Sequence, residues 1–312
     1  MPQPRPPLDL TIRCGFEFGY HSAAPTPALL LIKPQPTARQ AIRAQRLRLE
    51  PRVDVEESVD LFGNLVHRVI LPTGSVRISM DSLIAVPSTH EHLDAVDEPH
   101  AIADLSPKIL RFTLPSRYCD SDKLLDFAFQ RFGQVPHGLR RVQAICDWVH
   151  ENIEYRFGSG SPLYAASDVI NQRFGVCRDF AHVSIALCRC FNLPARYVTG
   201  YLPDVGYQDP GTPMDFHAYF QVYVGGRWHT YDARFNVPRL ARIHICHGLD
   251  GVDAASATFY GAAQLTWFNV WAYQVDPSEV QLGDPLDLSK RLDGTPEVRI
   301  PPSADRRVSA AV

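Results

Sequence analysis

The stretch GVCRDFAHVSIALCRC, residues 175–190, predicts a buried helix that begins at a cysteine. Its apolar residues face most sides, which is typical of a central helix, and the Asn-Leu-Pro at 192–194 ends it. Cys177 falls in the first turn, where unpaired backbone amides and the helix macrodipole favour negative charge. A thiol is nucleophilic as the thiolate, so its pKa must fall from about 8.5. The helix start therefore makes Cys177 a candidate nucleophile, and the same amides are suitable donors to an oxyanion.

The other two cysteines of this helix are predicted to be packing residues. Cys188 and Cys190 lie 11 and 13 positions beyond Cys177. On a helix, that separation is about 16 Å or more, too far for a shared site. The two also point to different faces, which argues against a shared metal. Three further cysteines are expected to be small core residues: Cys14, Cys119 and Cys146.

A general base and an orienting acid are predicted on two strands that follow the helix. In FHAYFQVYV, residues 216–224, alternation places His217 on the face opposite to the apolar residues. The next strand, RWHTYDARF at 227–235, follows a Gly-Gly hairpin turn and carries Asp232. Antiparallel neighbours bring such side chains together across the pair. Cys177, His217 and Asp232 therefore form a coherent candidate triad.

Rival residues fit these roles less well. His182 lies five positions after Cys177, about 140° round the helix from it, and is expected to be a packed helix histidine. His229 is three residues from Asp232, so alternation turns it to the opposite face. Asp215 is a rival acid. Asp179, also a rival, sits in the first helical turn, where the macrodipole favours a carboxylate for structural reasons alone.

The chain is organised as a β region followed by a mixed α+β region. Residues 8–86 hold several short alternating strands with turns every 8–12 residues, which predicts a β-sandwich. The domain boundaries expected are 1–100 for the sandwich, 101–276 for a catalytic core, and 277–312 for a polar, loosely ordered tail. Within the core, helices are predicted at 121–133 and 137–158, and strands at 195–202, 216–224, 227–235 and 265–275.

Two blocks of the sequence carry a resemblance to a known family. They are GVCRDFAHVSIALCRCFNLPARYVTGYL, from residue 175, and MDFHAYFQVYVGGRWHTYDARFN, from residue 214. They resemble the core domain of the transglutaminase-like superfamily. That family has a Gly-x-Cys at a helix start, an Ala-Arg-Tyr-Val-x-Gly-Tyr strand, a His-Ala on the next strand, and an Asp after a Trp on the one that follows. Its pattern matches Cys177, His217 and Asp232 as nucleophile, base and acid. The β region, with its DLFGN turn at 60–64, resembles the domain that precedes this core in many bacterial members.

The resemblance implies an α+β fold with a papain-like, transglutaminase-like core, in which the cysteine helix packs on an antiparallel sheet. It also implies acyl transfer from an amide through a thioester on Cys177, with water or an amine resolving that thioester. The expected substrate is a peptide or protein amide. Hydrolysis, as a peptidase or amidase, is favoured over transglutaminase-type transfer, because no device that keeps water from the thioester is visible. The alternative is a catalytically silent binding or scaffolding protein of this fold.

The remaining features exclude other classes of function. A net charge of −3 and a pI near 6.4 argue against nucleic acid or an anionic membrane as a partner. No apolar window is long enough to span a membrane, and no secretion signal is recognised, so the chain is expected to be cytoplasmic with reduced thiols. No cofactor is expected, since dinucleotide and P-loop motifs are absent. No metal is expected either, because His244 and His247 lack a second ligand pair. Asn171 and Gln172, just upstream of Cys177, are candidates for the second oxyanion donor.

Overall fold

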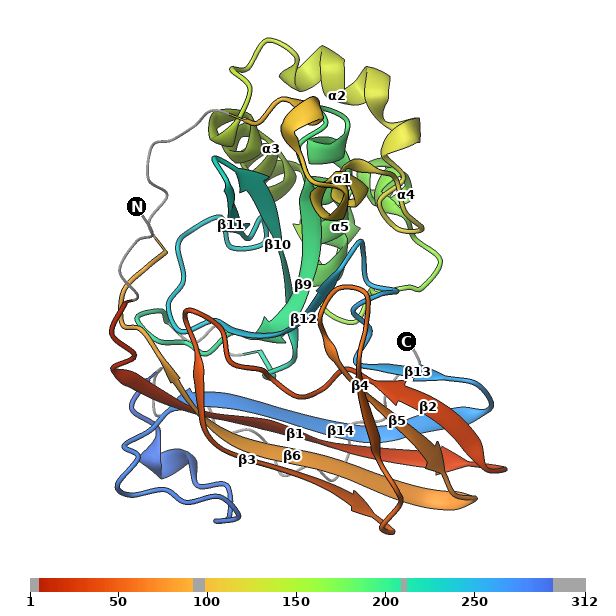
Figure 1. The fold of residues 1–312 in the computed structure, drawn as a ribbon, viewed down its shortest axis with the longest axis vertical. Helices are drawn as coiled ribbons and strands as arrows, with labels where there is room; N and C mark the ends of the chain where they lie inside the picture. The colour runs from red at the N-terminus through yellow and green to blue at the C-terminus, as the bar shows by residue number, and fades with distance from the viewer. Residues whose placement is uncertain (1–5, 92–98, 209–211, 294–312) are drawn as a thin grey trace.

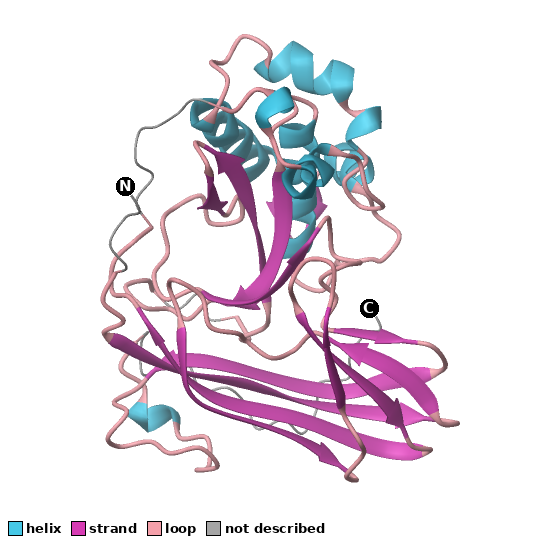
Figure 2. Ribbon diagram, in the orientation of Figure 1, coloured by secondary structure: helices cyan, strands magenta, loops and turns pink. Residues whose placement is uncertain are grey.

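The computed structural model describes residues 6–91, 99–208 and 212–293. Its strand-rich part lies at the bottom of Figure 1. Above it lies a mixed part, in which helices pack around a separate sheet. Figure 2 shows that nearly all helices lie in the mixed part. The predicted α+β class, with a β-sandwich and a core of helices on an antiparallel sheet, is confirmed.

The strand-rich part consists of two four-stranded antiparallel sheets that bury their facing sides together (Figure 1). Long apolar side chains alternate along the strands, so one face of each sheet is withdrawn from water. Phe16 and Ile78 of one sheet and Leu30 and Leu71 of the other are essentially fully buried. The first sheet has the order β14-β1-β6-β3, with β1 at Leu10–Ser22, β3 at Ala41–Glu50, β6 at Gly74–Val86 and β14 at Ala263–Gln274. The second has the order β13-β2-β5-β4, with β2 at Thr26–Leu30, β4 at Glu56–Val59, β5 at Leu65–Leu71 and β13 at Ala257–Phe259.

The chain returns to this sandwich after passing through the core. The aromatic run predicted as a strand at 265–275 does form one, but it pairs with β1 rather than with the core sheet. Two glycines of β1 lie directly opposite its tryptophans, Gly15 against Trp271 and Gly19 against Trp267. A Cβ at either glycine would collide with the facing indole. The segment 101–276, expected to form the core, therefore supplies two strands to the N-terminal sheets.

The segment after β14 also packs on the sandwich. Residues 277–293 belong to the region expected to be a loose tail. Val280 there is buried with Trp271 and Tyr273 in a small apolar cluster on the outer side of the first sheet. The amide of Leu292 donates to the carbonyl of Gln274 at 2.9 Å, which anchors the end of the described chain. Residues 294–312, the rest of the expected tail, lie outside the described residues.

The core is built on an antiparallel sheet of order β11-β10-β9-β12. Helix α5 packs against β10 and β9, with α3 beside it (Figure 1). The alternation predicted for residues 216–224 holds, because Phe220, Val222 and Val224 are fully buried. The sheet strands are β9 (Ala195–Tyr201), β10 (His217–Val224), β11 (Arg227–Tyr231) and β12 (Ile243–Gly248). The helices are α1 (Pro107–Leu110), α2 (Leu125–Phe132), α3 (Leu139–Asn152), α4 (Ala166–Gln172) and α5 (Cys177–Arg189), and a short parallel pair joins β7 (Glu154–Tyr155) to β8 (Phe174–Gly175). Single 3-10 turns lie at Ile102–Asp104, Arg111–Thr113, Ser121–Lys123 and Leu288–Lys290.

Two side-chain amides of the sandwich hold the edge strand β12 of the core. Gln40 donates to the carbonyl of His244 at 2.8 Å and accepts from its amide at 2.8 Å. Asn64 makes the same paired contact with His247, at 2.7 and 2.9 Å. Both amides are buried. They take the place of a neighbouring strand, so the backbone groups of this edge are satisfied without another strand.

Candidate active site

Cys177 is the first residue of α5, as the sequence predicts. The turn before it is tight: a Cβ at Gly175 would lie 2.7 Å from the Cβ of Asp179. The carboxylate of Asp179 accepts from the amide of Val176 at 2.8 Å, which caps the helix. Asp179, fully buried, is thus a capping residue, in line with the structural role expected for it.

His217 and Asp232 meet at the end of the core sheet. His217 is the first residue of β10, and Asp232 follows the last residue of the neighbouring strand β11. Their side chains are joined by a contact of 2.7 Å between His217 Nε2 and Asp232 Oδ2, and both residues are buried. Because Nε2 is engaged by the carboxylate, Nδ1 is the ring nitrogen left for a second partner.

The thiol of Cys177 lies at the start of the same strand. The backbone of Ala218, the residue directly after His217, lies close enough to the thiol to lower its pKa. The three residues of the predicted triad therefore gather where the N-terminus of α5 crosses the N-terminal end of β10.

A fourth residue that the sequence analysis missed belongs to this group. Arg242 Nη2 donates to Asp232 Oδ2 at 2.6 Å, on the same oxygen that contacts His217. The other carboxylate oxygen accepts from the amide of Arg234 at 3.2 Å. Arg242 comes just before β12, ten positions after Asp232, in a stretch with no periodicity or motif that marks it. Only the fold reveals the contact.

Burial and charge set the protonation of the group. Burial alone would raise the pKa of Asp232, but the charges of His217 and Arg242 and their hydrogen bonds hold it well below its usual range. Burial lowers the pKa of His217, and the neighbouring carboxylate reverses this only in part. Asp232 is therefore ionised and His217 is neutral at neutral pH.

The thiol departs from one sequence-based expectation. Burial raises the pKa of Cys177, and the Ala218 hydrogen bond and the charge of Arg234 oppose this only in part. The helix start was expected to favour a thiolate. Instead, the resting site pairs a neutral thiol with a neutral imidazole, because the nucleophile is enclosed by the sheet and by neighbouring side chains.

Tyr155 and Arg234 flank the thiol. The guanidinium of Arg234 stacks 3.6 Å from the centre of the Tyr155 ring, and the charges of both Arg234 and Asp215 act on Cys177. Burial raises the pKa of Tyr155 to about 12, so its hydroxyl is a donor at neutral pH. The candidate oxyanion donors do not fit: the side chain of Gln172 donates to the carbonyl of Phe174, and Asn171 is exposed on α4.

Comparison with known proteins agrees with this arrangement. The model of the transglutaminase-like superfamily core matches residues 126–233, and that of the bacterial transglutaminase-like N-terminal region matches residues 11–86. A crystal structure of a candidate cysteine protease from Cytophaga hutchinsonii is 33% identical, covers 86% of this chain and 91% of its own, and superposes with a TM-score of 0.77. The chain belongs to the transglutaminase-like superfamily.

Two sequence relatives are more distant. An uncharacterized protein of Mycobacterium leprae is 24% identical over 233 residues, which is 72% of this chain and 82% of that protein. Human kyphoscoliosis peptidase is 30% identical over 104 residues, 30% of this chain and 15% of the peptidase. The transglutaminase-like core is thus shared with a protein named as a peptidase. Among the described residues, no helix is both long and apolar enough to cross a membrane.

The rival residues of this transglutaminase-like core have structural partners. His182 is buried, accepts from the amide of Gly251 at 3.0 Å, and stacks on Tyr118. His229 is also buried, and its Nε2 lies 3.1 Å from the carbonyl of Val224. Asp215 is exposed and accepts from the amide of the next residue.

The metal and disulfide expectations can also be compared with the structure. The rings of His244 and His247 lie within 3.2 Å of each other, nitrogen to nitrogen. Within the described ranges, no group of three or more candidate ligands is placed to hold a metal. All seven cysteines are free thiols, and Cys177 is the one that is not fully buried, so Cys188 and Cys190 are packing residues as predicted.

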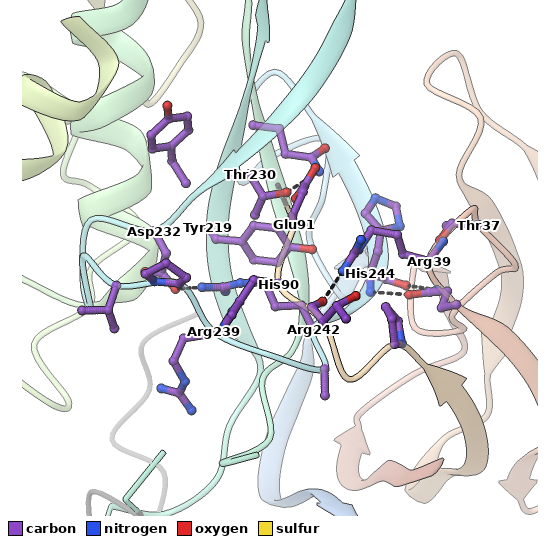
Figure 3. A pocket seen from close by; sticks show the side chains of 18 of the residues that line it. Thr37, Arg39, His90, Glu91, Tyr219, Thr230, Asp232, Arg239, Arg242 and His244 are labelled. Carbon is purple, nitrogen blue, oxygen red and sulfur yellow. Dashed lines mark hydrogen bonds and ion pairs between the residues drawn. The ribbon is translucent and has the colours of Figure 1, made fainter. Parts of the chain in front are cut away.

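A cavity of about 400 Å³ lies behind the acid of the candidate triad (Figure 3). We call it the rear cavity. Asp232 and Arg242 line one end, and the sandwich loops around Arg39 and His90 line the other. Cys177 and His217 are not among its lining residues. The rear cavity is therefore separate from the position where an amide would meet the thiol.

Proposed function

We propose that this protein is a cysteine-dependent amide-acyl enzyme that uses Cys177 as nucleophile, His217 as base and Asp232 as orienting acid. The observation that carries the proposal is the buried contact of 2.7 Å between His217 and Asp232. It is formed beside Ala218, whose backbone lowers the pKa of the Cys177 thiol. A charged carboxylate against a neutral imidazole, with a thiol at the adjoining backbone, is the arrangement that acyl transfer requires.

Acylation begins with a proton transfer. His217 Nδ1 takes the thiol proton as Sγ attacks the carbonyl carbon of the amide, and the carbonyl oxygen becomes an oxyanion. The amide of Cys177, at the first position of its helix, is a suitable donor to that oxygen. The imidazolium then gives its proton to the leaving nitrogen, the C–N bond breaks, and a thioester remains on Cys177.

In deacylation, His217 acts first as a base toward water and then as an acid toward the leaving thiolate. His217 takes a proton from water as the water oxygen attacks the thioester, the C–S bond breaks, and the thiolate recovers the proton from the imidazolium. An amine can replace water in this step, which would give transfer in place of hydrolysis. We favour hydrolysis, because the charges of Arg234 and Asp215 act on the thiol and give it polar surroundings.

The Asp232–Arg242 contact supports a working triad over a silent scaffold. Asp232 is buried and the side chain of Arg242 is only 13% exposed, and an ion pair withdrawn from water is costly to form. A binding protein without catalysis would not need this ion pair next to His217. The scaffold function remains the second candidate.

We also infer the setting of the enzyme. A peptide or protein amide is the substrate class, and neither nucleic acid nor membrane is a partner. We place it in the cytoplasm, since seven free cysteines are suited to a reducing compartment. We propose residues 1–100 and 101–276 as its two domains. The second segment contributes strands β13 and β14 to the sheets of the first.

A peptide panel tests the reaction. Peptides with and without an added primary amine are incubated with the full chain, and mass spectrometry distinguishes free acid from amine-linked product. Cys177→Ala is the negative control, and Arg48→Gln, a change of an exposed arginine on β3, is the matched positive control. We expect free acid from the unaltered chain and from Arg48→Gln. Product formed equally by Cys177→Ala, or no product from any amide, would contradict the proposal.

A further inference from the structure

The rear cavity has more positive than negative groups. Four arginines and two carboxylates are among the residues that line it. One carboxylate, Asp232, is already shared by His217 and Arg242. Two of the lining histidines, His244 and His247, do not add charge, because burial lowers the pKa of His244 to about 4 and that of His247 to about 2. Arg239 is also paired, with Asp204 at 3.0 Å, so the excess positive charge of this partly open cavity comes from Arg39 and Arg196.

Arg196 is the least compensated of these cations. Its Nε and Nη2 both donate to one amide oxygen of Gln221, at 2.9 and 2.7 Å, and its guanidinium carbon lies 4.2 Å from the centre of the Trp228 ring. Throughout the described chain, no carboxylate is within ion-pair distance of it, although Glu91 acts on it from farther away. Burial lowers its pKa to about 10, so it stays charged at neutral pH.

Arg196 is half-buried, and a charge partly withdrawn from water without a close counter-ion is unfavourable, so the energetics at Arg196 favour a bound anion. A guanidinium presents its N–H groups in a planar fork that matches carboxylate or phosphate oxygens. The remaining nitrogen, Nη1, is not used in the contacts with Gln221.

Tyr219 supplies a second donor. It lies among the lining residues on β10, with its hydroxyl directed into the cavity (Figure 3). Burial raises the pKa of Tyr219, so the hydroxyl is protonated at neutral pH and can donate. Arg242, whose guanidinium carbon lies 4.9 Å from the centre of the Tyr219 ring, adds positive charge beside that ring.

We propose that the rear cavity binds a small oxyanion, a carboxylate or a phosphate, through Arg196 and Tyr219. A volume of about 400 Å³ is in the range of small-molecule sites. The site is distinct from the amide-acyl centre, so it goes beyond the proposed function. Its occupant would lie beside Arg242, and therefore next to the charge that holds Asp232.

Titration calorimetry of the full chain tests this site. Inorganic phosphate and succinate are the two probes, with chloride at equal ionic strength as the reference. We expect saturable binding of at least one probe, and the stronger of the two identifies the kind of oxyanion. Arg196→Gln should weaken that binding at least about tenfold, and Tyr219→Phe by several fold, since each removes one donor.

Two further variants keep the result interpretable. Arg48→Gln, an exposed arginine on the sandwich, should bind as the unaltered chain does. Cys177→Ser should also bind normally, which separates this site from the proposed catalysis. The unaltered chain binding neither probe beyond chloride would overturn the proposal, as would equal binding by a folded Arg196→Gln. Tyr219→Phe keeps the cavity's charge, so it provides the second measurement if Arg196→Gln does not fold.

Discussion

Arg242 and Asp232 form a buried ion pair in which Arg242 Nη2 donates to Asp232 Oδ2 at 2.6 Å, the oxygen that also contacts His217. One carboxylate oxygen thus contacts both the neutral candidate base and the guanidinium of Arg242. Arg242 lowers the pKa of both neighbours, since its charge favours the ionised acid and disfavours a protonated imidazole. Arg242 is therefore a positioning residue that keeps His217 neutral and oriented.

Replacing Arg242 should move the pH dependence of thiol reactivity. In Arg242→Gln, the pKa of His217 should rise, because a cation that opposed protonation is gone. Reactivity that needs neutral His217 is lost as the pH falls through that pKa, so the acid limb should shift to higher pH. The measurement is the rate of iodoacetamide alkylation of Cys177 against pH. Arg242→Lys should restore part of the shift, and an acid limb that stays in place would show that the arginine has no electrostatic role.

Alkylation should also be selective for Cys177 and dependent on His217. The other six cysteines are buried, so brief treatment of the native chain should label one site. In His217→Gln, labelling at pH 7 should slow at least about tenfold, and it should rise only in alkaline solution, because burial raises the pKa of the thiol and no base remains to take its proton. Peptide mapping by mass spectrometry measures both effects.

His229→Gln is the matched control for that experiment. It removes a buried histidine on the neighbouring strand whose Nε2 contacts the carbonyl of Val224 rather than Asp232. Labelling of Cys177 should be unchanged in a folded His229→Gln chain. The reverse pattern, with His229→Gln slow and His217→Gln normal, would contradict the assignment of the base.

The elements around Cys177 could be predicted from the sequence because local rules determine them. The helix start at Gly175-Val176-Cys177 and the alternation around His217 depend on neighbours within one turn or one strand. The hairpin turn then fixes which strand lies beside His217, and so brings Asp232 near. In each case, the residues that decide the geometry are close in the chain.

The features that escaped prediction depend on contacts between distant segments. Strand β14 had the right pattern for a strand, but alternation does not say which sheet a strand joins, and its partner β1 is at the other end of the chain. Arg242 was missed for the same reason. The raised pKa of Cys177 was missed because enclosure by the sheet outweighs the favourable position at the helix start. Desolvation is a property of the packed molecule and has no local signature.

The amides that hold strand β12 should contribute measurably to stability. Asn64→Ala would leave the carbonyl and amide of His247 without their partner, and Gln40→Ala would do the same at His244. Leaving a buried backbone group unsatisfied costs about 1–3 kcal/mol, so each change should lower the free energy of unfolding by at least that order. Urea denaturation followed by fluorescence measures it. Gln281→Ala, an exposed glutamine, is the control and should have little effect. Equal stability of Asn64→Ala and the unaltered chain would mean that water replaces the lost contacts.

Stability should fall steeply below pH 6.5, and His182 should account for part of the slope. Burial lowers its pKa to about 3, so the folded chain keeps it neutral while the unfolded chain protonates it near 6.5. A group with a depressed folded pKa stabilises the fold fully above the unfolded pKa, and that stability is lost as the pH falls toward the folded value. At pH 5, the loss attributable to His182 is about 2 kcal/mol.

The slope rather than the absolute stability is the decisive measurement. His182→Gln removes the titrating ring. Between pH 6.5 and 4, its unfolding should therefore take up about one proton fewer, and its free energy of unfolding should depend less steeply on pH. His217, His244 and His247 also have lowered pKa values and should supply most of the slope that remains. Urea unfolding at several pH values gives both curves. Parallel curves for His182→Gln and the unaltered chain would show that His182 titrates equally in both states, and that its ring between Tyr118 and Tyr197 is hydrated in solution.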